Sequence, residues 1–137
     1  MTEFIDTNVL IRHLTGDPAD LASRAGAYLR DAQELLLVDL ILAEVVYVLE
    51  SFYEQSRHEV AELARSVIAF PAITVADEEL LLRALEVYEL ERLDFAEAYL
   101  VASAERTGIS RVSSFDRSID RMTTVTRIEP PPVQESG

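Results

Sequence analysis

The sequence predicts an α/β fold, a three-layer sandwich with a mainly parallel central sheet of about five short strands. Short apolar runs alternate along the chain with helix-like segments of ten or more residues. Capping residues, glycine and proline mark the ends of several of these segments. The length of 137 residues and the hydrophobic content of 49% suit one domain with a buried core.

The first half of the chain is expected to hold two strands and three helices. EFID (3–6) is the first strand and ELLLVD (34–39) the second. Helices are expected from about residues 18–31, 40–53 and 58–70. Their expected N-caps are Asp17, Asp39 and Ser56, because a short polar side chain there can accept a hydrogen bond from a free backbone N–H group.

The second half repeats this alternation after Pro71, which ends the third helix. AITVA (72–76) is the third strand, and two helical segments follow, the second ending at Gly108. The remaining expected elements are a strand at 109–115, a short helix or turn at 115–122 and a strand at 123–129. We therefore expect one domain at residues 1–129, followed by a flexible, proline-rich tail at 130–137.

The amino-acid composition restricts the cellular locations that we expect for this protein. The chain has no cysteine, which excludes disulfides and cysteine-zinc sites and disfavours secretion. The acidic N-terminus does not resemble a signal peptide, and no apolar run is long enough to cross a bilayer. We expect a cytoplasmic protein that has no contact with a membrane.

The charge balance is strongly acidic, with 25 acidic residues against 12 basic ones and a net charge of −13. Such a charge argues against binding a phosphate backbone through a basic face, and solubility is its simplest explanation. A bound metal ion can nevertheless reverse the sign of the local charge. Arginines clustered at the opening of a pocket can also bind phosphate whatever the total charge.

Several carboxylates occupy places where an apolar or small residue would be less costly. Asp6 follows the first strand, Glu44 interrupts the apolar run LILAEVVYVL, and Asp116 follows the fourth strand. Asp94 and Glu97 lie one helical turn apart at the start of DFAEAYLVASA. In parallel sheets ligands bind at the carboxyl ends of the strands, which favours a ligand role for Asp6 and Asp116.

Each of these acids also has a purely structural explanation. Asp94 and Glu97 form a good capping box, and capping does not exclude metal binding. Asp116 and Asp120 fit turn positions. Glu44 has no capping role and needs a narrow polar side on its helix if it is exposed.

Clustered carboxylates repel one another, so a cluster of this kind is unstable without cations. Oxygen ligands without cysteine or a well-placed histidine select Mg²⁺, with Mn²⁺ as a possible substitute, over zinc. The usual role of such ions in an acidic pocket is phosphoryl transfer.

The segments FIDTNVLIRHL, ILAEVVYVL, LDFAEAYLVASAERTG and VSSFDRSIDRM, in this order, resemble PIN-domain ribonucleases, and among them the VapC-like toxins of toxin–antitoxin pairs. The resemblance covers about residues 2–129. It implies a PIN-like fold and a Mg²⁺-dependent endoribonuclease that hydrolyses RNA with an activated water.

The resemblance also assigns residues. It implies Asp6, Glu44, Asp94 and Asp116 as catalytic residues and Asp6, Asp94, Glu97 and Asp116 as metal ligands. The sequence departs from the usual D-F-A-D-A-L pattern, because Glu97 occupies the place of the usual ligand. The resemblance further implies supporting roles for Thr7, Asn8 and Ser114, to which we add Asp120 as an outer ligand. Arg12, Arg92 and Arg117 lie beside acidic motifs and are candidates for holding RNA phosphates, although a solvated surface role is the alternative for each.

The resemblance implies an RNA substrate and a cognate antitoxin as partners. Apolar surface on the early helices, around residues 21–29 and 46–53, would suit a homodimer. Two other enzyme classes fail on residues present. A haloacid-dehalogenase-like phosphatase needs an aspartate where Asn8 stands, and a receiver-like domain needs a late lysine in a chain that has none. A catalytically inactive PIN-like interaction module remains the alternative.

Overall fold

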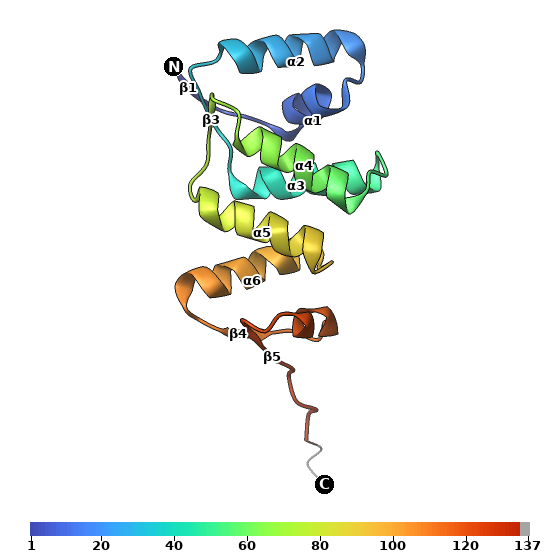
Figure 1. Cartoon of the computed structure of the whole chain (residues 1–137), viewed down its shortest axis with the longest axis vertical. Coiled ribbons are helices and arrows are strands. Elements are labelled where there is room, and N and C mark those ends of the chain that lie inside the picture. Colours follow the sequence, from blue (N-terminus) through green and yellow to red (C-terminus); the bar gives the residue numbers. More distant parts are fainter. Residues whose placement is uncertain (135–137) are drawn as a thin grey trace.

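A computed structural model describes residues 1–134 and shows an elongated molecule of six α-helices and five short strands in that part of the chain (Figure 1). The strands are β1 (Thr2–Phe4), β2 (Glu34–Leu36), β3 (Ile73–Thr74), β4 (Arg111–Ser113) and β5 (Thr126–Ile128). The helices are α1 (Thr7–Thr15), α2 (Ala19–Asp31), α3 (Asp39–Ser51), α4 (Arg57–Ile68), α5 (Glu78–Leu90) and α6 (Phe95–Thr107), with a 3₁₀ helix, η1 (Arg117–Arg121). The predicted α/β class is confirmed.

All strand pairings are parallel, as predicted, but the strands form two sheets rather than one. β2 lies between β1 and β3, and Glu3 stands opposite Leu35 in the register. β4 pairs only with β5. The chain leaves the first sheet through α5 and α6, which pack closely together, so β4 and β5 come to lie beyond α6 and not beside β1 (Figure 1).

The core runs through the helices and the inner face of the first sheet. Leu42, Leu49, Leu81, Leu85 and Tyr88 are fully buried. Burying one side chain of this size stabilises the folded state by roughly 1.5–3 kcal/mol. The α3–α4–α5–α6 layers therefore carry most of the apolar packing, and they set the distance between the two sheets.

Helix α1 was not predicted. Its signals are local: Asp6 caps it through an N–H group at 2.8 Å, and Gly16 ends it with φ +70°. Residues 7–15 follow the first strand directly and are largely apolar, so their helical periodicity is difficult to recognise in the sequence. The caps at Ser56 and Asp94 are confirmed, since Ser56 accepts from the Glu59 N–H and Asp94 from the Glu97 N–H.

Two predicted caps are wrong. Pro18 and Val38 occupy the N-cap positions of α2 and α3, and neither has a side chain that can accept a hydrogen bond. Asp39 is instead the first residue inside α3, where its charge still faces the positive end of the helix. The predicted strands are also longer than the observed ones, because only two or three residues of each find a partner strand.

The predicted tail at 130–137 lies partly outside the described residues, which end at 134. Residues 130–134 are exposed, have no regular secondary structure and lead away from the body (Figure 1). The flexibility of this tail stays a prediction, as does the domain boundary at residue 129.

Candidate metal site

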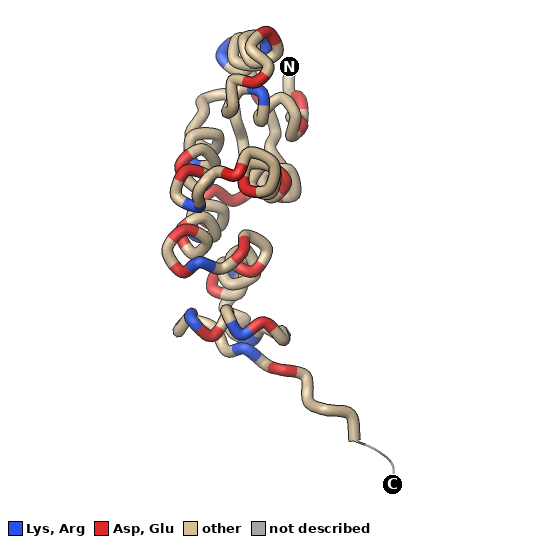
Figure 2. The backbone as a smooth tube through the Cα atoms, turned by 90° about the vertical axis from the view of Figure 1, so that its right-hand side faces the viewer, with Lys and Arg blue, Asp and Glu red and all other residues tan. Residues whose placement is uncertain are grey.

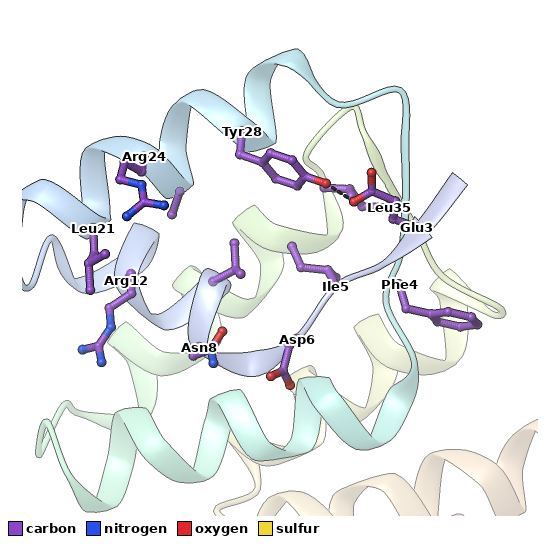
Figure 3. Close-up of a pocket in the computed structure, with 12 residues that line it drawn as sticks. Glu3, Phe4, Ile5, Asp6, Asn8, Arg12, Leu21, Arg24, Tyr28 and Leu35 are labelled. Atoms are coloured by element: carbon purple, nitrogen blue, oxygen red, sulfur yellow. Dashed lines mark hydrogen bonds between the residues drawn. The ribbon is translucent and has the colours of Figure 1, made fainter. Parts of the chain in front are cut away.

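Asp6 lies at the carboxyl end of β1, as the sequence predicts. Its Oδ1 accepts the Thr7 N–H at 2.8 Å, so the side chain caps α1. The residue is exposed, and in Figure 3 its carboxylate points toward the neighbouring helix α3. One carboxylate oxygen therefore serves the helix, while the second has no hydrogen-bond partner among residues 1–134.

Asp6 also lines a pocket of about 590 Å³ between β1, α1 and α2 (Figure 3). Asn8 lies beside it, and Arg12 and Arg24 stand at the end of the pocket away from β1. Near β1, the Tyr28 hydroxyl donates a hydrogen bond to the Glu3 carboxylate. The pocket thus combines two acids, Asp6 and Glu3, with two guanidinium groups.

Thr7 and Glu44 differ sharply in their surroundings. Thr7 is 6% exposed, and its Oγ1 is buried without a hydrogen-bond partner among the described residues. Glu44 is exposed on α3, so this apolar helix does have the narrow polar side that exposure requires. Since α1 packs against α3, Asp6 and Glu44 belong to adjoining helices.

The closest gathering of predicted site acids lies between α6 and η1. Asp94 caps α6, Glu97 is in the first turn of that helix, and Asp116 caps η1. The carboxyl groups of Glu97 and Asp116 share a hydrogen bond. The Ser118 hydroxyl donates to Glu97 Oε2 at 2.9 Å, and the Ser118 N–H donates to Asp116 Oδ1 at 2.8 Å.

The pKa values record the crowding of these acids. Burial, followed by the hydrogen bond with Asp116, raises the pKa of Glu97 to about 7. The hydrogen bond from Glu97, followed by those from Ser118, lowers the pKa of Asp116 to about 2. Asp94 adds a further negative charge that favours the protonated form of Glu97. The two carboxyl groups thus lie close enough to shift each other's pKa in opposite directions, and a cation could relieve their repulsion.

The chemistry of these donors suits a hard divalent cation, but within residues 1–134 the three carboxylates do not all come within 4.8 Å of one another. Glu97, Asp116 and Asp94 offer carboxylate oxygens, and Ser118 offers a hydroxyl. Such all-oxygen sets suit Mg²⁺ or Mn²⁺ and not zinc.

The structure does not bring all the predicted acids together. Asp6 directly follows β1, at the end of the molecule that holds the three-stranded sheet. β4 and η1 lie at the opposite end, with α5 and α6 between them (Figures 1 and 2). The predicted set is thus divided into two partial groups. One contains Asp6 with Glu44 on the neighbouring helix, and the other contains Asp94, Glu97 and Asp116.

The other predicted site residues near η1 differ in whether they form hydrogen bonds or ion pairs within residues 1–134. Ser114 Oγ accepts the Asp116 N–H at 2.9 Å, and its supporting role in the site stays a prediction. Asp120 forms a two-point ion pair with Arg127, at 3.0 and 3.2 Å, and is therefore already neutralised. Arg92 and Arg117 are exposed and make no ion pair within residues 1–134.

Sequence reasoning missed two residues of this site. One is Ser118, whose position two residues after an aspartate is the spacing of an Asx turn and was a usable signal. The other is Arg121, which donates to the carbonyls of Glu91 and Arg92 at 3.3 and 3.1 Å. Arg92 has φ +60°, a costly conformation for arginine, so Arg121 holds a strained turn just before Asp94.

We expect Arg121→Ala to lower the free energy of unfolding by about 1 kcal/mol, because it removes two charge-assisted hydrogen bonds at an exposed site. Urea unfolding followed by circular dichroism measures the change. Arg117→Ala is the matched control on the same 3₁₀ helix, and we expect a change within about 0.5 kcal/mol. Equal losses in both variants would show that Arg121 has no special role in this turn.

A different group meets a distance criterion for metal binding within residues 1–134. Ligand atoms of His58, Glu62 and Glu89 lie within 4.8 Å of one another. Arg65 already donates to Glu89 at 2.7 Å and to Glu62 at 3.3 Å, and His58 contacts Glu89 at 2.5 Å. These residues form an ion-pair network on the surface of α4 and α5, and none of them belongs to the predicted site.

Comparison with known proteins identifies the class. The family model described as "PIN domain" matches residues 4–124. The chain belongs to the PIN domain family. It is 21% identical over 123 residues to a VapC ribonuclease of Aquifex aeolicus (strain VF5), covering 88% of this chain and 91% of that protein.

A solved structure is also similar. It is the crystal structure of Mycobacterium tuberculosis VapC20, a Sarcin-Ricin loop cleaving toxin, at 22% sequence identity and a TM-score of 0.41. The match covers 86% of this chain and 92% of the VapC20 chain. Among the described residues, no helix combines the length and the apolar character needed to cross a membrane.

Proposed function

We propose that this protein is a Mg²⁺-dependent endoribonuclease and the toxin of a toxin–antitoxin pair. Membership of the PIN domain family and the name of the Aquifex relative support this function. The observation that carries it is the meeting of Glu97 and Asp116, whose carboxyl groups are close enough to shift each other's pKa, with Asp94 capping the same helix. Such a pair is poised to exchange its proton for a cation.

The residues have distinct proposed roles. Glu97 and Asp116 hold the ion, Asp94 supplies a further carboxylate, and Ser118 with Ser114 fixes their orientation. Asp6 and Glu44 are proposed as further site acids, and they form a separate group beside α3. A bound Mg²⁺ would lower the pKa of a water molecule and neutralise charge on a phosphate diester. Mn²⁺ is expected to substitute for it.

Arginine supplies the positive charge for RNA beside this acidic site. Arg111, Arg117, Arg121 and Arg127 all fall within the β4–η1–β5 segment, and basic positions are visible at that end of the molecule in Figure 2. Arg117 and Arg92 are proposed to hold flanking phosphates there, and Arg12 to do so in the pocket beside Asp6. The overall acidity makes non-specific RNA binding weak without the cation.

The function is tested by incubating the purified protein with RNA in the presence of Mg²⁺ and sequencing the new 5′ ends. We expect cleavage that EDTA abolishes and that Mn²⁺ restores. Because a water molecule, and not the neighbouring 2′-hydroxyl, would attack phosphorus, the products should carry a 5′-phosphate and a 3′-hydroxyl. Cleavage that persists in EDTA, or products with 2′,3′-cyclic phosphates, would contradict the proposed chemistry.

The biological role is tested by induced expression in cells that lack the antitoxin. We expect growth arrest together with new RNA ends, and rescue of growth when the cognate antitoxin is co-expressed. The proposed cytoplasmic location agrees with both partners. If growth continues and no new ends appear, the toxin role fails. The alternative, an inactive interaction module, then predicts no heat on titration with Mg²⁺.

Metal affinity should depend on pH through Glu97. Its pKa is raised to about 7, so the proton shared with Asp116 is bound below pH 7 and must leave for the cation to bind. We therefore expect Mn²⁺ affinity to rise by about five-fold from pH 6 to pH 7, by about ten-fold in all by pH 8, and to level off above pH 8. Calorimetric titration measures it. Glu97→Gln is the control, because it removes this titration and should flatten the profile.

A further inference from the structure

Two arginines stand at one end of the pocket beside Asp6. Arg12 of α1 and Arg24 of α2 both line the pocket, at its end away from β1 (Figure 3). Arg12 donates to the Asp17 carbonyl at 3.2 Å, and neither guanidinium makes an ion pair within residues 1–134. Because the chain has a net charge of −13, two guanidinium groups without a carboxylate partner indicate a place for an anionic ligand.

The opposite end of this pocket carries a carboxylate. Glu3 of β1 lies there, and its Oε2 accepts a hydrogen bond from the Tyr28 hydroxyl. In Figure 3 the Tyr28 ring extends from α2 toward Glu3, so the ring forms part of the wall at this end. Glu3 Oε1 has no hydrogen-bond partner among the described residues. An N–H donor of a ligand can therefore bind to this carboxylate.

The space between the two ends has mostly apolar walls and the size of a small-ligand site. Its volume of about 590 Å³ falls in the usual range of such sites, roughly 300–1,000 Å³. Asp6, a proposed site acid, lines the same pocket, so a ligand bound there lies beside it. The apolar residues of the wall are Ile5, Val9, Leu21, Ala25 and Leu35.

A nucleotide presents matching groups in the same order. Its phosphate suits the two guanidinium groups, and its flat base suits the apolar wall and the Tyr28 ring. Guanine suits Glu3 best, because its Watson–Crick edge has two adjacent N–H donors for one carboxylate. Adenine and cytosine place an amino group beside a ring-nitrogen acceptor, and uracil places its single N–H between two carbonyl oxygens. An acidic peptide would also suit the arginines, but the position of Asp6 beside the pocket favours the substrate of the proposed reaction.

We propose that this pocket binds one guanosine nucleotide of the RNA next to the bond that is cleaved, and thereby sets the base preference of cleavage. Arg12 and Arg24 hold its phosphate, the Tyr28 ring stacks on the base, and Glu3 accepts the N–H groups of the base. This inference rests on the proposed ribonuclease function, because it concerns the choice of substrate beside Asp6.

Binding of nucleoside 5′-monophosphates to the full chain in EDTA tests the pocket without cleavage. In NMR titrations we expect guanosine monophosphate to bind about tenfold more tightly than uridine monophosphate, the usual gain from one two-point base contact. Inosine monophosphate lacks the 2-amino group and should lie between them. Equal affinities would overturn the proposal. Binding of a peptide of alternating glutamate and leucine without binding of guanosine monophosphate would also overturn it, and would make the pocket a peptide site.

Arginine variants locate the bound nucleotide. Arg24→Ala should weaken the binding of guanosine monophosphate by about tenfold, because it removes a charge-assisted contact with phosphate. Arg30→Ala is the matched control, since Arg30 is exposed on the same helix but does not line this pocket. We expect it to change the affinity by less than about twofold. Equal losses in the two variants would place the nucleotide elsewhere and contradict the proposal.

Two further substitutions separate recognition of the base from stacking. Glu3→Gln should remove the preference for guanosine over uridine monophosphate, because an amide cannot accept two N–H donors side by side. Glu34→Gln on the neighbouring strand β2 is its control and should keep the preference. Tyr28→Ala should weaken all nucleotides by about tenfold, whereas Tyr28→Phe keeps the ring and should retain most of the affinity. An unchanged preference in Glu3→Gln would refute the role of Glu3.

Sequencing of the cleaved ends tests the same choice in RNA. We expect guanine to be enriched at one position next to the cleaved bond, and this enrichment should disappear in Glu3→Gln but persist in Glu34→Gln. Cleavage without any base preference would overturn the guanosine pocket and leave the ribonuclease function standing. Binding of guanosine monophosphate without any cleavage of RNA would instead refute the ribonuclease function and leave only a nucleotide-binding pocket.

Discussion

Asp116→Asn is expected to reduce RNA cleavage by about a hundred-fold or more. Changing even a residue that only hydrogen-bonds to a metal ligand commonly costs about 10–100-fold in metal affinity or activity, and Asp116 is a proposed ligand itself. Asn keeps the cap of η1, because its side-chain oxygen can still accept the Ser118 N–H that Asp116 binds at 2.8 Å. The substitution removes the negative charge of Asp116, which faces the Glu97 carboxyl group. Activity should therefore fall while the fold is retained.

Three measurements separate these effects. RNA cleavage gives the loss of activity, Mn²⁺ titration gives the loss of affinity, and thermal unfolding shows whether the fold is intact. Asp120→Asn is the matched control on the same segment: it breaks an ion pair with Arg127 at 3.0 Å but leaves the Glu97–Asp116 pair in place. We expect it to keep cleavage within a few-fold of wild type. A similar loss in both variants would indicate that the segment matters only as a structural unit.

Leu85→Ala is expected to cost about 3 kcal/mol of unfolding free energy, in the usual range of 2–5 kcal/mol for buried leucines. Leu85 lies on α5 and is fully buried in the layer that holds the two sheets apart. Removing its side chain leaves a cavity among residues that cannot all relax. Urea unfolding followed by circular dichroism measures the loss.

Leu82→Ala is the control, because Leu82 is on the same helix but is 37% exposed. Its loss should stay below about 1 kcal/mol, since part of the side chain is already hydrated and no closed cavity forms. Equal costs at the two positions would mean that the α5–α6 packing differs from that described above. Leu85→Ala should also weaken the placement of Asp94 and Glu97, because α6 rests on α5.

The sequence indicated most of the elements through local signals. Ser56 and Asp94 cap their helices as predicted, and Gly108 ends α6 with φ +76°. These signals depend only on hydrogen bonds between neighbours in the chain, so they survive whatever the tertiary arrangement. Helix α1 was missed because its apolar residues directly follow the first strand, and a short apolar run there is also compatible with a longer strand.

The candidate site was predicted in part. The acids after β1 and β4, on α3 and at the start of α6 are present at the predicted places along the elements. The pairing of Glu97 with Asp116 agrees with the expected convergence, whereas Asp6 and Glu44 stand apart from that pair. The contact of Ser118 with Glu97 and those of Arg121 with Glu91 and Arg92 span 21 to 30 residues of sequence and could not be predicted from it, whereas the Asx-turn spacing of Ser118 after Asp116 was a local signal.

The sequence by itself determined the α/β class, the order of strands and helices apart from α1, and the acidic, cysteine-free chemistry that suits a hard cation. Periodicity, caps and composition are properties of short segments, and they do not require knowledge of which segments meet. Only the tertiary structure decided that the strands divide into two sheets, that Glu97 lies against Asp116, and that β1 and β4 each pair on one side only within residues 1–134. The packing of α6 on α5 causes this division, because it depends on apolar contacts between helix faces that no single segment specifies.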